Sequence, residues 1–366
     1  MSPSGTPLRQ TAVTWTAVLS KTTFAHQPPV RLRRSGEWGS AVAALSSPKP
    51  HSLLRSKLAK SFRTSAHWLL FAGVIAFVAG AGATENGASV YPVGIETVLP
   101  GLTPAPRGTT LYGYVASYRA NELDNSQGQS AVPDFKLDVF ATAVKVVHNW
   151  NLPVLGGTLN SNIAVPFLHE TLNLPIGQFS KFGVGNSSIG VIELGYRKGN
   201  WHWLYEGDIL LPGGSYSRGA PLNVGQHNYA VAPVAAFSYL PAQGRWEISC
   251  KTQYIINSED TATRYHSGDE FMSEYVAMAE VSKRVALGVN GYFYQQTTDD
   301  YQNGAVFADG FRGRDFAVGP EFRFRLGPHS GFALKYQRDT LVQNRPRGNA
   351  LWFQFALPLS LGDSRQ

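Results

Sequence analysis

The stretch Trp201-His202-Trp203-Leu204-Tyr205-Glu206-Gly207-Asp208-Ile209 decides how this chain is expected to fold. Its odd positions are aromatic or apolar apart from one glycine, whereas its even positions include His202, Glu206 and Asp208. Successive side chains of a β-strand point to opposite faces of the sheet, so this pattern gives one apolar and one polar face. Similar short segments follow one another from about residue 110 to residue 361, without any long apolar run.

Twelve such segments are predicted as strands. They span roughly residues 109–119, 135–148, 157–167, 187–198, 200–211, 227–239, 243–257, 271–283, 284–296, 314–326, 330–338 and 350–361. Strands cross a bilayer only as a closed barrel, because every backbone polar group there must be hydrogen-bonded. We therefore predict an all-β fold, an antiparallel transmembrane β-barrel of about 12 strands at 109–361, followed by a tail at 362–366.

The connections between these segments alternate in length. Short ones, with Gly, Pro or Asn as tight hairpins require, fall at 198–200, 241–244, 282–284 and 326–329. Longer ones fall at 120–134, 168–186, 212–226, 258–270, 297–313 and 339–349. Short periplasmic turns and long extracellular loops are typical of the outer membrane of a Gram-negative bacterium. A soluble β-sandwich or lipocalin-like barrel, which also has alternating strands, stays open as the alternative.

Two details fit the strand pattern less well. Pro166, Pro233 and Pro320 interrupt predicted strands, where a proline removes one donor from the ladder. In the second segment, Lys136, Asp138 and Lys145 cannot all lie on the polar face of a regular strand. We therefore expect a β-bulge there.

The basic residues gather near the N-terminus. The net charge is +7, yet the first 83 residues hold ten of the 32 Lys/Arg residues and a single acidic one, Glu37. The rest of the chain therefore carries 22 basic and 24 acidic residues, a net charge of −2. Nucleic acid is accordingly not expected as a partner.

Residues 55–83 resemble a signal peptide. Four basic residues between Arg55 and Arg63 precede the apolar run Trp68–Val78, and Ala81 and Ala83 form an A-x-A cleavage site. The apolar run is shorter than the roughly 20 residues of a transmembrane helix, although a buried or anchoring helix stays an alternative. Residues 1–54, rich in Ser, Pro and Arg, are predicted to be a disordered leader, and the true translation start is expected nearer Leu53.

The segment 84–108 is too rich in Pro and Gly for a strand or helix, yet too apolar to remain in water. We predict that it folds into or under the periplasmic mouth as a plug, and a disordered connection to the first strand is the alternative. The residues that carry this prediction are Tyr91, Pro92, Ile95, Leu99 and Pro100.

No catalytic or metal-binding motif stands out: HExxH, GxSxG, Walker A and zinc spacings are absent from the sequence. The single cysteine, Cys250, excludes an intramolecular disulfide. We expect neither enzymatic activity nor a cofactor or metal.

The polar positions of the strands say more about function than the motif search does. A charge that faces lipid at the bilayer midplane costs about 2–4 kcal/mol, so the charged side chains are expected to face the lumen. The predicted lumen or substrate-path residues are Glu193, Arg197, Glu206, Glu247, Lys251, Glu274, Glu280, Tyr292, Tyr294, Glu321, Arg323, Arg325 and Lys335. Both signs are present, which predicts ion pairs that either fill a narrow lumen or line a solute path.

Several stretches, in their order along the chain, resemble one known family. They are Glu85 to Gly94, Pro106-Arg107-Gly108 before Tyr112, Gly183-Val184-Gly185, Leu222-Asn223-Val224-Gly225, Tyr265 to Phe271, Gly291 to Asp300 and Val318-Gly319-Pro320. The chain resembles the outer-membrane proteins of meta-cleavage phenol degradation, also called SphA-like transporters. One departure is that Gly362 to Gln366 follow the aromatic closing strand, which in outer-membrane barrels usually ends the chain.

The resemblance implies passive uptake of small organic, hydrophobic or aromatic compounds across the outer membrane. The expected partners are outer-membrane lipid, the barrel-assembly machinery and a small organic solute. The alternative is a non-transporting barrel, either structural or a receptor whose long loops bind a partner.

Overall fold

The computed structural model describes residues 88–327 and 330–360. The predicted leader 1–54, the signal peptide 55–83 with its cleavage site at Ala81 and Ala83, and the tail 362–366 lie outside the described residues. Within the described residues, no helix is long and apolar enough to cross a membrane.

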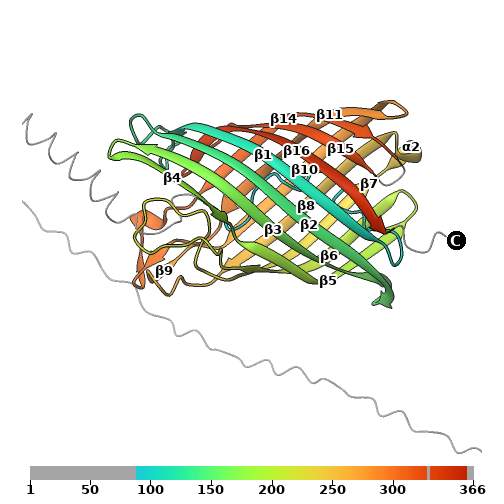
Figure 1. The fold of residues 1–366 in the computed structure, drawn as a ribbon, viewed down its shortest axis with the longest axis horizontal. Coiled ribbons are helices and arrows are strands. Elements are labelled where there is room, and N and C mark those ends of the chain that lie inside the picture. Colours follow the sequence, from blue (N-terminus) through green and yellow to red (C-terminus); the bar gives the residue numbers. More distant parts are fainter. Residues whose placement is uncertain (1–87, 328–329, 361–366) are drawn as a thin grey trace, which may run out of the picture. The chain divides into compact units, whose positions relative to one another are not determined.

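Twelve long antiparallel strands close into a barrel (Figure 1). They are β1 (Thr109–Leu123), β2 (Lys136–Val154), β3 (Gly157–Leu174), β5 (Ser187–Lys198), β6 (Trp201–Leu211), β7 (Ala230–Tyr239), β8 (Trp246–Asn257), β10 (Glu270–Ser282), β11 (Val285–Gln296), β14 (Arg314–Arg325), β15 (Gly331–Asp339) and β16 (Pro346–Ser360). Each pairs with its neighbours in sequence, and β1 pairs with β16 to close the sheet. The predicted all-β barrel of twelve strands is confirmed.

The two ends of the barrel differ. One end, here called the turn end, carries tight connections such as Leu155-Gly156, Gly199-Asn200 and the short helix α2 (Pro241–Gly244). The start of β1 and the end of β16 also meet there, with Thr109 opposite Ser360. The other end, here called the loop end, carries the long connections. These include a small sheet of β9 (Tyr265–His266), β12 (Tyr301–Gln302) and β13 (Ala305–Val306), and the 3-10 helix η1 (Ala308–Gly310).

One predicted loop is instead a β-hairpin. Residues 168–186 were expected to be a long connection, but β3 continues to Leu174 and β4 (Gly177–Val184) returns alongside it. The two-residue alternation persists here, because Leu168 and Leu172 line the interior while Phe167 and His169 are exposed on the outer face. The predicted strand 157–167 is therefore too short, because β3 runs on for seven residues beyond it.

The three prolines expected to disturb the strand pattern lie where one ladder is interrupted. Pro166 sits between the part of β3 that pairs with β5 and the part that pairs with β4. Pro233 falls in a gap of the β7–β8 register, and Pro320 falls in a gap of the β14–β15 register. Since the missing N–H has no ladder partner to lose on that side, these prolines do not break the barrel.

The expected bulge between Lys136 and Lys145 is wrong. The β1–β2 register is unbroken from Thr109 opposite His148 to Ala120 opposite Leu137. Lys136 and Asp138 instead point outward near the loop end, where Asp138 forms an exposed ion pair of 3.3 Å with Arg119. The strand continues past the apolar band of the barrel, so outward charges there meet water.

The distribution of polarity is the reverse of that in a soluble barrel. Many large apolar side chains are exposed on the outer face, including Ile209, Val231, Ile248, Leu287 and Leu351. Charged side chains such as those of Glu274, Glu321 and Lys335 are instead buried inside. This arrangement matches a wall that faces lipid and excludes the soluble alternatives.

Candidate functional site in the barrel lumen

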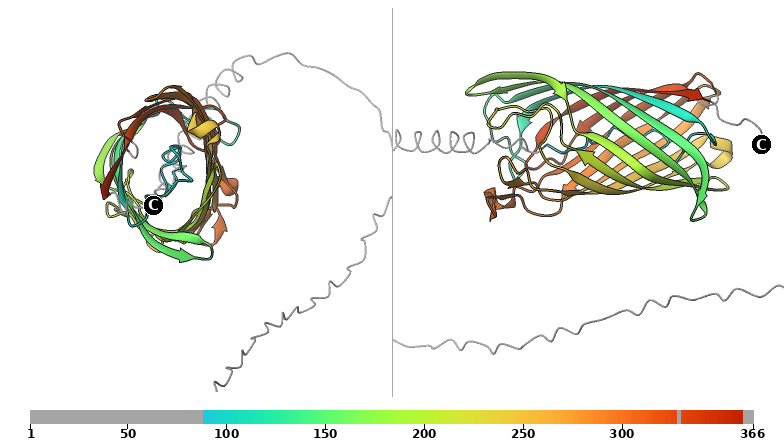
Figure 2. Two further views of the ribbon diagram at one scale, coloured as in Figure 1. Left: turned by 90° about the vertical axis from the view of Figure 1, so that its right-hand side faces the viewer. Right: turned by 60° about the horizontal axis from the view of Figure 1, so that its bottom comes forward.

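The N-terminal residues 88–108, here called the lumen segment, run lengthwise through the barrel. Figure 2 shows this segment inside the ring of strands when the barrel is viewed along its axis. At the loop end, the amide of Gln226 donates to the carbonyl of Ala88 at 3.4 Å. At the turn end, the amide of Asn149 donates to the carbonyl of Pro104 at 2.9 Å. The prediction placed the segment in or under the periplasmic mouth, and the structure shows that it continues from there to the opposite end.

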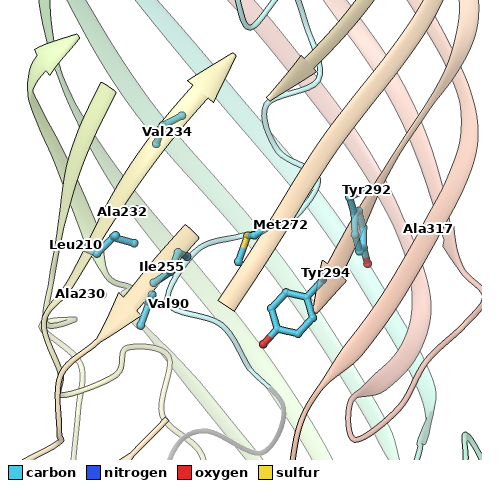
Figure 3. Close-up of a cluster of buried hydrophobic side chains, with 10 residues drawn as sticks. All are labelled: Val90, Leu210, Ala230, Ala232, Val234, Ile255, Met272, Tyr292, Tyr294 and Ala317. Atoms are coloured by element: carbon cyan, nitrogen blue, oxygen red, sulfur yellow. The ribbon is translucent and has the colours of Figure 1, made fainter. Parts of the chain in front are cut away.

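Near the loop end, the lumen segment enters a buried apolar cluster. Val90 packs among wall residues that include Leu210, Ile255, Met272 and Tyr294 (Figure 3). Ile95 enters a second cluster with Tyr114 and Trp352. Apolar burial therefore explains why this Pro/Gly-rich stretch is held inside the barrel.

Halfway along the lumen, one carboxylate of the segment binds two wall lysines. Glu96 accepts from the ammonium of Lys145 at 2.6 Å and is also ion-paired with Lys251. Lys251 further donates to the hydroxyl of Tyr91 at 3.0 Å, and that hydroxyl donates to Glu274 at 3.3 Å. These five residues are called the central ionic cluster, and they connect the lumen segment to β2, β8 and β10.

A third wall lysine holds the backbone of the segment. The ammonium of Lys335, which has no solvent exposure, donates to the carbonyls of Ile95 at 2.7 Å and Gly94 at 3.2 Å. Gln337 also donates to the Gly94 carbonyl at 3.0 Å. Gly94 has φ of +87°, and a Cβ there would lie 2.4 Å from the side-chain oxygen of Gln337, so only glycine fits.

Toward the turn end, an arginine joins two strands to the segment. Arg323 donates to Glu321 and to Glu247, each at 2.5 Å. Thr97 of the segment donates to Glu321 at 3.1 Å. The segment then touches the wall itself, because a Cβ on Gly101 would lie 2.4 Å from the backbone nitrogen of Ser238.

We expect Gly101→Ala to lower the free energy of unfolding by about 1–3 kcal/mol, the usual cost of overpacking. The added methyl would meet backbone atoms of β6 and β7, which cannot move aside as a flexible side chain can. Urea unfolding in detergent measures the effect. Gly207→Ala is the matched control, because nothing lies within 4 Å of its Cβ position. Equal stabilities of the two variants would show that the segment does not touch the wall there.

Most predicted lumen residues do face the interior. They are Glu193, Glu206, Glu247, Lys251, Glu274, Tyr292, Tyr294, Glu321, Arg323 and Lys335. Three others lie at the rim of the turn end. Arg197 is exposed, and Arg325 is exposed but forms a 3.0 Å ion pair with the half-buried Glu280. Near the turns, side chains at the inward-facing positions of a strand lie at the barrel rim and meet water. Alternation along the strand therefore does not place them inside the lumen.

The residues predicted for the plug occupy different places along the lumen segment. Tyr91 belongs to the central ionic cluster, Pro92 lines a cavity, and Ile95 is buried against Tyr114 and Trp352. Leu99 and Pro100 form a turn near the turn end, in which the Leu99 carbonyl accepts from the Leu102 amide at 3.0 Å.

Sequence reasoning missed the residue that organises the centre of the lumen, Glu96. A usable signal existed, because Glu96 is the single acidic residue between Glu85 and Glu122 and lies in an apolar stretch. It also missed Asp315, Asp339 and Arg345, which line or adjoin the interior near the loop end. Among the described residues, no group of His, Cys, Asp and Glu is arranged to hold a metal ion.

A cavity of about 350 Å³ opens between the lumen segment and the wall near the loop end. It is called the loop-end cavity. Its lining is mostly apolar and includes Val90, Phe135, Leu137, Val139, Leu172 and Trp352. Its size lies within the range of roughly 300–1,000 Å³ that is usual for small-molecule sites.

Two loops beside this cavity are tied together by a buried carboxylate. Asp260 accepts from Tyr216 at 2.9 Å, and one of its oxygens lies 3.0 Å from Nδ1 of His227. Burial raises the pKa of Asp260, but the hydrogen bonds from His227, the Ala262 amide and Tyr216 outweigh burial and hold it below its usual value. Asp260 therefore stays ionised at neutral pH and holds loop 212–229 against residues 258–264.

A family model described as "Putative MetA-pathway of phenol degradation" matches residues 120–355. The chain belongs to this family. The match covers more than half of the chain and confirms the resemblance seen in the sequence. No curated protein sequence matches the chain at a significant level.

Among solved structures, the COG4313 outer membrane channel from Pseudomonas putida F1 is similar to this family member. It is 17% identical, with a TM-score of 0.62, and the alignment covers 74% of this chain and 100% of that channel. The CymD monoaromatic hydrocarbon channel aligns with a TM-score of 0.37 at 7% identity, covering 70% of this chain and 90% of its own. The first likeness supports the barrel fold.

With its closed barrel and apolar outer face, this family member is an outer-membrane protein of a Gram-negative bacterium. In such barrels the short turns face the periplasm and the long loops face the outside. The turn end is thus periplasmic, and the loop end, with the loop-end cavity and Ala88, is extracellular.

Proposed function

We propose that this chain is an outer-membrane channel for passive uptake of small organic compounds, chiefly hydrophobic or aromatic ones. The observation that carries the proposal is the loop-end cavity, an apolar site of about 350 Å³ on the extracellular side of a lumen otherwise lined by charges. Apolar walls with a few polar groups are typical of sites that bind small organic molecules. The description of the family as a phenol degradation pathway agrees with such solutes.

The position of the lumen segment favours a narrow passage and argues against a wide pore. It contacts β10 through Tyr91, β15 through Lys335 and β7 through Gly101, so it occupies the lumen at three levels. We infer that it acts as a plug and that solutes pass beside it or move it. The inward-facing charges then position the plug, and some of them also line the path.

The proposed role requires no catalysis, and we infer that the chain is not an enzyme. We further propose the division into leader, signal peptide, plug, barrel and tail at 1–54, 55–83, 84–108, 109–361 and 362–366. Membrane insertion would depend on the barrel-assembly machinery, which would recognise the closing strand β16.

A non-transporting barrel is the second candidate, and the filled lumen is the observation that favours it. The central ionic cluster and the Arg323 pairs occupy much of the interior, as a purely structural network would. The projecting loop-end sheet of β9, β12 and β13 would then be the surface that binds a partner.

Liposome swelling with purified protein distinguishes the two candidates. The panel contains phenols, aromatic acids and sugars, and empty liposomes give the rate of direct passage through lipid. We expect small aromatic compounds to enter faster than in empty liposomes, while sugars enter at the empty-liposome rate. Glu274→Ala and Arg323→Ala loosen the plug and should raise the sugar rate. If no solute enters faster than in empty liposomes, the chain is not a channel.

A further inference from the structure

A groove on the outer wall of the barrel, here called the wall groove, lies close to the turn end. It has a volume of about 400 Å³ and is formed by β6, β7 and β8. Its lining includes the aromatic side chains of Trp201, Trp203, Tyr205 and Phe237 and the small ones of Ala235, Cys250 and Thr252. Ala235 lies directly opposite Thr252, and Phe237 lies opposite Cys250, so the small residues leave a hollow between larger neighbours.

The polar atoms at the floor of the wall groove bond with one another. Sγ of Cys250 lies 3.2 Å from Oγ of Ser273, and the same oxygen lies 3.4 Å from Oγ1 of Thr252. Because these groups already have partners, the groove does not require a polar ligand. With its aromatic sides it fits an apolar chain.

The wall groove extends over the depth of one membrane leaflet. Trp201 begins β6 at the turn end, and Tyr205 lies four residues further along the strand. At about 3.4 Å per residue and a strand tilt of about 40°, these two residues differ in depth by about 10 Å. Half of the hydrocarbon core measures about 15 Å. Since the turn end is periplasmic, the groove lies in the periplasmic leaflet, and Trp201 marks the interface with water.

Basic side chains gather around the interface end of the wall groove. Three neighbouring connections at the turn end, β5–β6, β7–β8 and β10–β11, carry the exposed residues Arg197, Lys198, Arg245, Lys283 and Arg284. Within the described part of the chain, none of these five is paired with a carboxylate. Glu280, at the end of β10, is paired with Arg325 instead.

This positive charge is not spread evenly over the rims of the barrel. The β2–β3 connection at the same end, residues 149–157, contains no charged residue. At the loop end, basic side chains are matched by carboxylates, as in the pairs Arg119–Asp138 and Arg312–Asp299. A girdle of aromatic residues requires no such charges. The unpaired cations beside the wall groove therefore indicate an anionic ligand.

Two of the cations come from adjoining turns at the interface end of the groove. Lys198 lies directly opposite Trp201 in the β5–β6 hairpin, and cross-strand partners share one face of the sheet. Arg245 follows the turn after β7, in which the Leu240 amide donates to the carbonyl of Asn200 at 2.9 Å. This hydrogen bond holds the two turns together.

We propose that the wall groove binds an anionic phospholipid of the periplasmic leaflet. One acyl chain lies along Ala235 and Thr252 beside the aromatic side chains, and Lys198 and Arg245 bind the phosphate at the interface. The surrounding basic residues favour a lipid with a net negative charge over a zwitterionic one. The site lies on the outer wall, separate from the lumen, and does not depend on the proposed uptake function.

Native mass spectrometry of the purified, detergent-solubilised barrel tests this proposal by titration with phosphatidylglycerol or phosphatidylethanolamine. We expect one phosphatidylglycerol molecule to bind each barrel at least about tenfold more tightly than phosphatidylethanolamine. A Lys198→Gln/Arg245→Gln double variant should weaken phosphatidylglycerol binding about tenfold or more, because each Lys or Arg near an anionic lipid contributes roughly fivefold.

A second variant, Ala235→Phe, tests the groove itself. Ala235 is exposed on the outer wall, so a larger apolar side chain there fills the groove and leaves every charge in place. It should weaken phosphatidylglycerol binding about tenfold. The matched control is Arg338→Gln, which removes an exposed charge from β15 near the loop end and should leave the affinity unchanged. Resistance to SDS at low temperature verifies that every variant is folded.

Equal affinity for the two lipids overturns the proposal. So does unchanged phosphatidylglycerol binding in the double variant or in Ala235→Phe, or an equal loss in Arg338→Gln. The same spectra report the oligomeric state. Dimers that Ala235→Phe disrupts would show that the groove holds a second copy of the chain, and this result also overturns the proposal.

Discussion

Deletion of residues 88–104 is expected to raise the single-channel conductance of the purified protein in planar bilayers severalfold. The deleted residues cross the lumen from Gln226 at the loop end to Asn149 at the turn end. The remaining wall is polar on its inner face, with charges of both signs that water and salt ions can solvate once the segment is gone. Ion flow would then depend on the full barrel cross-section.

The barrel itself should survive this deletion, because its strands pair with one another along closed ladders and not with the segment. Circular dichroism and the resistance of the folded barrel to SDS at low temperature verify this. Adding the 88–104 peptide back is a matched control and should reduce the conductance. An unchanged conductance in the folded deletion variant would mean that the segment does not obstruct the lumen.

Glu96→Ala is expected to have the largest effect of any single substitution in the lumen. The change leaves the ammonium groups of Lys145 and Lys251 without their shared carboxylate. Removing one partner of a buried ion pair typically costs about 3–5 kcal/mol, because the remaining charge is left uncompensated. Urea unfolding measures this loss, and a double-mutant cycle with Lys251→Gln should show strong coupling between the two positions.

Asp138→Ala provides the comparison for this prediction. It also breaks an ion pair, with Arg119, but on the outer face where both side chains are exposed. Exposed pairs contribute about 0–1 kcal/mol, so this variant should unfold close to wild type. Similar losses in the two variants, or additive effects in the double-mutant cycle, would contradict the role given to Glu96.

The barrel could be predicted from sequence because the pattern that specifies it lies within each short segment. Alternation at period two requires no knowledge of which strand lies beside which, and the lengths of the connections then order the strands. The predictions failed at residues whose surroundings are not set by the bilayer. Lys136 and Asp138 lie beyond the apolar band, and Pro166 lies where β3 changes partner. Neither fact is visible in a single segment.

The site was less predictable because it consists of contacts across the lumen. Tyr91 and Glu274 are 183 residues apart, and Lys335 and Ile95 are 240 apart. Strand phase indicates that a side chain points inward, but it does not indicate what the side chain meets there. Glu96 is the clearest case, because it lies outside every predicted strand and yet forms ion pairs with lysines of two strands.

The most direct test of this account is the accessibility of the lumen segment in intact cells. In a Cys250→Ser background, single cysteines replace Ser89 near the extracellular end and Thr103 near the periplasmic end, and a bulky membrane-impermeant maleimide is added outside. A segment that fills the lumen lengthwise predicts that Ser89→Cys is labelled, whereas Thr103→Cys is labelled only after the cells are broken. Labelling of Thr103→Cys in intact cells, or no labelling of Ser89→Cys, would contradict the arrangement described here.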